Sequence, residues 1–137
     1  MYGRNLRAYQ KTNLEAELSV ADPHRIVQMM FEGLLERLAQ IKGAIERKDY
    51  AYKADRVTKA LGIVNGLQSA LDRSQDPELY ERMYALYDYL KELINRASMD
   101  LTMEPLDEAA RLIAPIKQAW DKITPEAKAE AYARQHG

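Results

Sequence analysis

The sequence predicts an all-α fold, an antiparallel up-down four-helix bundle. Apolar residues recur every three or four positions through four long segments, which is the spacing of one helical face. Short proline-containing or polar connections separate these segments, and β-branched residues never alternate with polar ones over the length of a strand. We therefore expect residues 22–123 to form the bundle, residues 1–21 to be a loosely docked N-terminal segment, and residues 124–137 to be a short helical tail.

The first helix is expected to begin at Asp22-Pro23, because aspartate suits the N-cap and proline suits the first helical position. The charged cluster Arg47-Lys48-Asp49 supplies its C-terminal boundary. One face between these limits is apolar, and it carries Val27, Met30, Phe31, Leu34, Leu38, Ile41 and Ile45.

The second helix, expected from Tyr50 to Asp72, contains the most informative stretch of the chain. Residues 60–71 hold no charged side chain in a protein that is 30% charged. Gly62 and Gly66 lie opposite the apolar stripe of this helix. A glycine inside a helix costs about 0.5–1 kcal/mol relative to alanine, so the pair needs an explanation. Either this helix packs closely on both sides within its own domain, or its neutral face is a groove for another helix.

The third helix is expected to begin at Asp76-Pro77. Its apolar residues follow an unbroken 4-3 spacing that is typical of a bundle seam, and they are Leu79, Met83, Leu86, Leu90, Leu93 and Ala97. Tyr80, Tyr84 and Tyr87 lie beside this seam. They are either its water-facing edge or an amphipathic contact surface.

The fourth helix is expected to begin at Pro105, with Pro115 kinking it or leaving a local gap in its hydrogen bonds. Its seam has the same spacing and consists of Leu106, Ala109, Ile113, Ile116, Trp120 and Ile123. Thr124-Pro125 then restarts a weak helix through Ala131.

Composition argues against several classes of function. The net charge of −1 gives no general attraction to nucleic acid or to anionic lipid, and no apolar run approaches the ~20 residues of a membrane span. The chain has no cysteine, and no glutamate lies three residues before either His24 or His136, as a di-iron bundle requires. We expect a cytoplasmic protein that is not an enzyme and that carries no metal or other cofactor.

Short motifs spread over nearly the whole chain resemble one known family. The longest is DPHRIVQMMFEG at residues 22–33, and AYQ at residues 8–10, LYDYL at 86–90 and AW at 119–120 follow the same order. The departures are conservative, such as Phe31 where tyrosine is usual. In order and spacing these motifs are similar to those of the FliS family, the flagellin-specific export chaperones of bacterial flagellar assembly.

The resemblance implies a bundle that binds the disordered C-terminal segment of flagellin. Holding that segment would prevent premature polymerisation and assist flagellar type III export. The resemblance also implies that the N-terminal segment, with Tyr9, folds back over an apolar surface that the client later occupies. The export apparatus and other flagellar regulators are further partners to expect.

Ordering a disordered client costs free energy, so a large apolar contact is needed. We expect that contact on the neutral face of the second helix and the tyrosine-bearing edge of the third. The partner-binding residues would be Tyr9, Arg56, Lys59, Gly62, Ile63, Gly66, Ser69, Ala70, Tyr84 and Tyr87. The alternative is a helical-bundle interaction protein without a chaperone role, whose neutral face pairs with itself in a homodimer.

Overall fold

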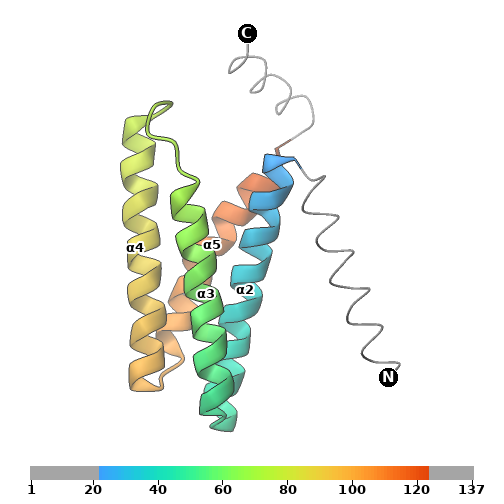
Figure 1. Cartoon of the computed structure of the whole chain (residues 1–137), viewed down its shortest axis with the longest axis vertical. Coiled ribbons are helices and arrows are strands. Elements are labelled where there is room, and N and C mark those ends of the chain that lie inside the picture. The colour runs from blue at the N-terminus through green and yellow to red at the C-terminus, as the bar shows by residue number, and fades with distance from the viewer. Residues whose placement is uncertain (1–21, 124–137) are drawn as a thin grey trace, which may run out of the picture.

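The computed structural model describes residues 22–123, which form four antiparallel helices (Figure 1). The helices are α2 (Pro23–Arg47), α3 (Tyr50–Ser69), α4 (Pro77–Asp100) and α5 (Glu104–Asp121). Each helix packs mainly against two others: α2 contacts α3 and α5, and α4 contacts the same two. The predicted four-helix bundle is therefore confirmed, and the described part of the chain contains no strand. The expected N-terminal segment and C-terminal tail lie outside the described residues.

Aspartate caps begin three of the helices. The Asp22 carboxylate accepts a hydrogen bond from a backbone N–H of the first turn of α2 at 2.8 Å, and Asp76 does the same for α4 at 3.1 Å. Proline follows each of these caps, as the sequence predicts. Asp49 caps α3 in the same way, because its carboxylate accepts a hydrogen bond from the backbone N–H of Tyr52 at 3.2 Å. This residue therefore begins α3 as well as lying just after the end of α2.

The end of α3 differs from the prediction. The helix ends at Ser69 instead of Asp72. The Asp72 carboxylate accepts hydrogen bonds from the backbone N–H of Ser74 at 2.9 Å and from its hydroxyl at 2.6 Å. These bonds lower the pKa of Asp72 and favour a turn, because aspartate side chains compete with helical hydrogen bonding.

The fourth helix agrees with its prediction except for its first residue. It begins at Glu104, one residue before Pro105. It then continues through Pro115 to Asp121, and Pro115 itself is exposed. Proline removes one backbone donor, and the helix continues past it, as the predicted seam beyond Pro115 requires.

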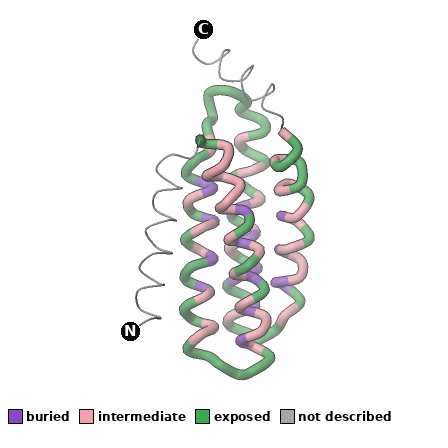
Figure 2. Tube along the Cα trace, turned by 90° about the vertical axis from the view of Figure 1, so that its right-hand side faces the viewer, coloured by how far each residue is buried: buried purple, intermediate pink, exposed green. Residues whose placement is uncertain are grey.

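Side chains from all four helices form the apolar core. The largest fully buried residues are Leu34, Ile41, Val64, Leu90, Leu93, Ile94, Leu106 and Ile113. Figure 2 shows the buried residues along the middle of the bundle, with exposed residues at its ends. This core follows the predicted seams over most of their length, but it also contains Ala44, Tyr87 and Ile94, which were outside those seams, and it leaves out Leu79 at the start of α4.

Leu79 was expected in the α4 seam, but 53% of its surface is exposed. The cause is the register between α3 and α4. The Gln68 side chain donates to the backbone carbonyl of Tyr84 at 3.2 Å, which places the last turn of α3 level with the third turn of α4. The first two turns of α4, residues 77–84, therefore extend beyond the end of α3. We call these residues the α4 overhang.

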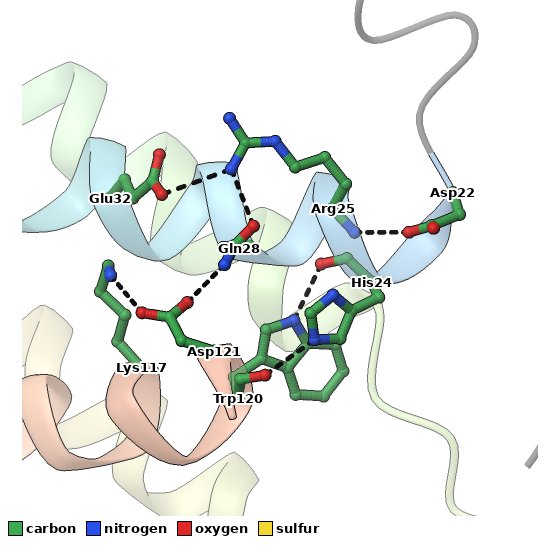
Figure 3. Close-up of polar contacts among 8 residues, drawn as sticks. All are labelled: Asp22, His24, Arg25, Gln28, Glu32, Lys117, Trp120 and Asp121. Atoms are coloured by element: carbon green, nitrogen blue, oxygen red, sulfur yellow. Dashed lines mark hydrogen bonds and ion pairs between the residues drawn. The ribbon is translucent and has the colours of Figure 1, made fainter. Parts of the chain in front are cut away.

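The start of α2 and the end of α5 are joined by a pair of reciprocal hydrogen bonds (Figure 3). His24 Nε2 donates to the backbone carbonyl of Trp120 at 2.7 Å, and Trp120 Nε1–H donates to the carbonyl of His24 at 2.8 Å. The two rings stack with centroids 4.8 Å apart. Gln28 adds a bond to Asp121 at 2.6 Å. We call His24, Gln28, Trp120 and Asp121 the α2–α5 clamp.

Asp121 is the charged member of this clamp. Hydrogen bonds from Lys117 and then Gln28 lower the pKa of its carboxyl, and the nearby His24 acts in the same direction. The rings of Trp120 and Phe31 also pack in a T-shaped arrangement, with their centroids 6.5 Å apart. This contact links the clamp to the core. The sequence pattern placed Trp120 in the core and gave His24 no role.

Candidate functional site

The neutral face predicted on α3 is divided between an inner side and an outer side. Ile63 and Gly66 are half-buried against α2, whereas Gly62 and Ser69 are exposed. The predicted groove is therefore not one continuous strip on α3. On the side that faces α2, residues of α3 and residues of α2 together form the surface.

Gly66 has a packing role within the bundle. A Cβ atom at Gly66 would lie 2.6 Å from Cε of Met30 on α2, so the missing side chain makes room for methionine. In the same seam, Cδ1 of Ile63 lies 3.4 Å from the position of a Cβ at Gly33. Each helix thus carries a glycine opposite a large side chain of the other. For Gly66, close packing within its own domain is the explanation that the structure provides.

Gly62 has no such role. No described atom lies within 4 Å of a Cβ placed there, and the residue is exposed in the middle of α3. Its helical cost of about 0.5–1 kcal/mol has no compensating contact among the described residues. Of the two glycines, this one presents bare backbone to the surroundings.

Basic side chains border this surface toward the N-terminal end of α3. Arg56 donates to Gln40 of α2 at 3.3 Å, pairs with Asp55, and lies over the Tyr52 ring at 5.2 Å from its centroid. Arg37 of α2 shares the same Gln40 oxygen at 3.0 Å. The planar guanidinium of Arg56 is thus held in place.

Lys59 is exposed, and no ion pair joins it to another described residue. The residues described in this and the preceding paragraphs form one surface across two helices, which we call the α2–α3 surface. It consists of Met30, Gly33, Arg37, Gln40, Tyr52, Arg56, Lys59, Gly62, Ile63 and Gly66. It brings five of the predicted partner-binding residues together: Arg56, Lys59, Gly62, Ile63 and Gly66.

The other predicted residues lie elsewhere. Ser69 and Ala70 are exposed at the end of α3, near Tyr84, which is 40% exposed and contacts the Tyr80 ring at 5.8 Å. Tyr87 is 3% exposed, and burial raises its pKa to about 12. It belongs to the apolar core and cannot meet a partner while the bundle is closed. Tyr9 lies outside the described residues.

A buried amide pins α3 to α4 beside these tyrosines. Besides its bond to Tyr84, Gln68 donates to Asp88 at 2.9 Å and accepts from Lys91 at 2.8 Å. The bond from Gln68, then Lys91, holds the pKa of Asp88 below its ordinary value. A satisfied polar network of this kind favours one alignment of two helices.

Five residues of the α2–α3 surface were not among the predicted partner-binding residues: Met30, Gly33, Arg37, Gln40 and Tyr52. A helical pattern shows which residues share a face of one helix, but not which faces of two helices meet. A small residue on each of two consecutive helices, here Gly33 and Gly66, is the signal that could have indicated the seam.

The side chains at these surfaces are suited to binding another molecule. Among residues 22–123, no group of three or more His, Asp or Glu side chains could hold a metal ion. None of the described helices is long and apolar enough to cross a membrane. What the surface offers is bare backbone, aliphatic side chains and positioned arginine, the features by which one protein binds another.

Comparison with known proteins places this helical bundle in a family. The model of the family described as "Flagellar protein FliS" matches residues 5–127. The chain belongs to the FliS family.

The relatives span almost the same length. The chain is 38% identical over 119 residues to flagellar secretion chaperone FliSB of Pseudomonas aeruginosa, covering 87% of this chain and 94% of that protein. It is 37% identical over 122 residues to flagellar secretion chaperone FliS of Vibrio cholerae, covering 89% and 90%. The protein of the same name from Salmonella typhimurium is 28% identical over 123 residues. The family resemblance inferred from the motifs is confirmed.

Proposed function

We propose that this protein is a cytoplasmic flagellar export chaperone that binds the C-terminal segment of flagellin on its α2–α3 surface. Membership of the FliS family, with relatives named flagellar secretion chaperones, supports the general role. The family is one of chaperones and not of enzymes. Binding would hold flagellin unpolymerised until it reaches the export apparatus.

The observation that carries the assignment to this surface is Gly62. A helix gains stability when an exposed glycine is replaced by alanine, and Gly62 has open space for that change. Its presence is explained if the backbone of a second helix approaches α3 at this point. Close approach of two helices requires small residues at the crossing.

The residues around Gly62 suit an amphipathic helix. Ile63 and the aliphatic stems of Arg56 and Lys59 supply apolar area, while the charged heads of the two basic residues remain in water. This is the helix-in-groove mode, in which apolar anchors repeat every three or four residues. A client that orders on binding needs such area to offset its lost conformational freedom.

The test compares two arginine substitutions that add the same charge. Gly62→Arg places a long side chain at the proposed crossing, and Asn95→Arg places one on an exposed position of α4. We expect Gly62→Arg to weaken binding of a flagellin C-terminal peptide at least about tenfold, or about 1.4 kcal/mol, by calorimetric titration. Asn95→Arg should leave the affinity unchanged.

Stability separates loss of the site from loss of the fold. Gly62→Arg should raise the free energy of unfolding by about 0.5–1 kcal/mol, because arginine is the better helix former. Gly66→Arg would be a poorer test, since its side chain must displace Met30.

Unchanged peptide affinity in Gly62→Arg would refute the assignment to this surface. Light scattering addresses the homodimer alternative. A wild-type dimer that becomes monomeric in Gly62→Arg would show that the face pairs with itself.

A further inference from the structure

The α2–α3 surface is neutral at one end and basic at the other. Three contacts fix which residues lie opposite each other across the seam, and these pairs are Met30 with Gly66, Gly33 with Ile63, and Gln40 with Arg56. The same antiparallel register places Arg37 opposite Lys59, between the second pair and the third. From the first pair to the last, the side chains therefore change from apolar to basic.

The neutral end is formed by the last turns of α3 and the first turns of α2. Residues 60–71 carry no charged side chain. On α2, Ile26, Met29 and Met30 lie on the side of the helix that carries Gly33, and all three are half-buried. The nearest charged residues of α2, Arg25 and Glu32, pair with each other at 3.4 Å. This end therefore offers aliphatic contact and bare backbone.

The basic end gathers side chains of both helices that are held in place. Arg37 of α2 and Arg56 of α3 both donate to Oε1 of Gln40, at 3.0 and 3.3 Å. Arg56 and Arg47 lie over the Tyr52 ring, 5.2 and 5.9 Å from its centroid. Two guanidinium groups that share one neutral oxygen repel each other, and a nearby negative charge would relieve that repulsion.

Two carboxylates accompany this cluster, and they neutralise only part of its charge. Asp55 pairs with Arg56, and Glu36 lies 3.6 Å from Nη1 of Arg37. The Nε and Nη2 donors of Arg37 form no hydrogen bond with another described residue. Lys59 likewise pairs with none of the described carboxylates. The basic end therefore keeps donors for a further acceptor.

An α-helix has an electrical direction that such a surface can distinguish. Its last four carbonyl groups have no partner within the helix, and they carry the equivalent of about −0.5 charge. Its first turn carries about +0.5. Arginine and lysine side chains donate to the carbonyls of a C-terminal turn, whereas an N-terminal turn offers only further donors. The basic end therefore favours the C-terminal end of a bound helix.

We propose that the client helix binds in one direction, with its C-terminal turns over Arg37 and Arg56 and its N-terminal turns over Met30 and Gly66. It then runs parallel to α2 and antiparallel to α3, since these two neighbouring helices run in opposite directions (Figure 1). The partner that fits is an amphipathic helix with acidic residues in its last turns. This inference rests on the proposed binding at Gly62 and adds the direction and charge pattern of the client.

Cysteine pairing measures the direction, because the natural chain contains no cysteine. Ala51 and Ser69 are exposed and lie on one line of α3, five turns or about 27 Å apart. The probe is a helical peptide of about 18 residues from the flagellin C-terminal segment, with one cysteine at either end. Ala51→Cys, at the basic end, should form a disulfide at least about tenfold faster with the peptide whose cysteine is C-terminal. Ser69→Cys, the matched control at the neutral end, should show the opposite preference.

Two peptides of equal composition test the charge pattern. One carries a glutamate in its last turn, and the other carries it in its first turn. Because glutamate favours an isolated helix when it lies in the first turn, helix formation alone predicts tighter binding of the second peptide. We expect the first to bind at least about fivefold tighter by calorimetric titration. Arg37→Gln should abolish this difference, whereas Arg111→Gln, at an exposed position of α5, should preserve it.

The outcomes separate the direction from the surface. Reversed preferences of the two cysteine variants, or equal rates with both peptides, would overturn the proposed direction. A glutamate effect that persists in Arg37→Gln would overturn the role of the basic end. If either occurs while Gly62→Arg still weakens binding, the surface stands and only this inference fails. If Gly62→Arg leaves the affinity unchanged, the proposed surface is wrong and the direction is wrong with it.

Discussion

The α2–α5 clamp and the α4 overhang lie at the same end of the bundle but differ in how their seam residues are used. Trp120 stacks on His24 and meets Phe31, donates a hydrogen bond to the backbone carbonyl of His24, and accepts one from the His24 ring at its own carbonyl. Leu79 has an equally regular place in its own seam and is exposed. The comparison teaches that apolar spacing marks the face a helix could bury, whereas burial depends on where the neighbouring helices end.

The largest expected effect comes from truncating one seam residue in each region. Trp120→Ala removes the stacked ring, one hydrogen-bond donor and the contact with Phe31, and should lower the free energy of unfolding by about 3 kcal/mol. Leu79→Ala should lower it by less than about 1 kcal/mol, because much of the side chain is already in water. Urea unfolding followed by circular dichroism measures both. Equal losses would show that the two regions are packed alike.

A smaller effect separates the hydrogen bonds of the clamp from its ring stacking. His24→Phe keeps an aromatic ring against Trp120 but removes the donor to the Trp120 carbonyl. We expect a loss of about 1 kcal/mol, the usual net value of one such bond. Fluorescence of Trp120, the single tryptophan of the chain, reports the unfolding midpoint in urea. A variant as stable as the natural chain would show that stacking alone holds the corner.

The smallest expected effect is a change in acid sensitivity at the clamp. The folded state lowers the pKa of Asp121, so this carboxylate stabilises the fold above its ordinary pKa near 4, and that contribution is lost as the pH falls through and below this value. Asp121→Asn should therefore make the decline of stability between about pH 5 and pH 3 shallower. Asp72 and Asp88 keep their own lowered pKa values, so part of the decline should remain. An unaltered decline would show that Asp121 contributes nothing to it.

Much of the fold was predictable because the signals are local. The caps at Asp22 and Asp76 and the apolar spacing of each helix depend on residues within a few positions of one another. The misplaced end of α3 has a local cause that was overlooked, the turn made by Asp72 with Ser74. The family could also be inferred, since its motifs are short and ordered along the chain.

The candidate site was predictable only in part, because its geometry joins separate helices. Gly62 and Gly66 are equivalent in the sequence, as uncharged helical positions four residues apart. They differ because Met30 of α2 reaches Gly66 and no described atom reaches Gly62. Likewise, Tyr84 and Tyr87 share one face of α4, yet Tyr87 is buried in the core and Tyr84 lies at the point where α3 ends.

The sequence by itself determined that this chain forms four amphipathic helices, where two of them begin, and which family it belongs to. Each of these properties depends on spacing and capping within one segment. The tertiary structure alone decided that Gly66 packs inside the bundle while Gly62 faces outward, that His24 and Trp120 close one corner, and that Leu79 is left uncovered. The physical reason is that helix ends and registers are set by contacts between distant segments, and these contacts assign each apolar face to the core or to the surface.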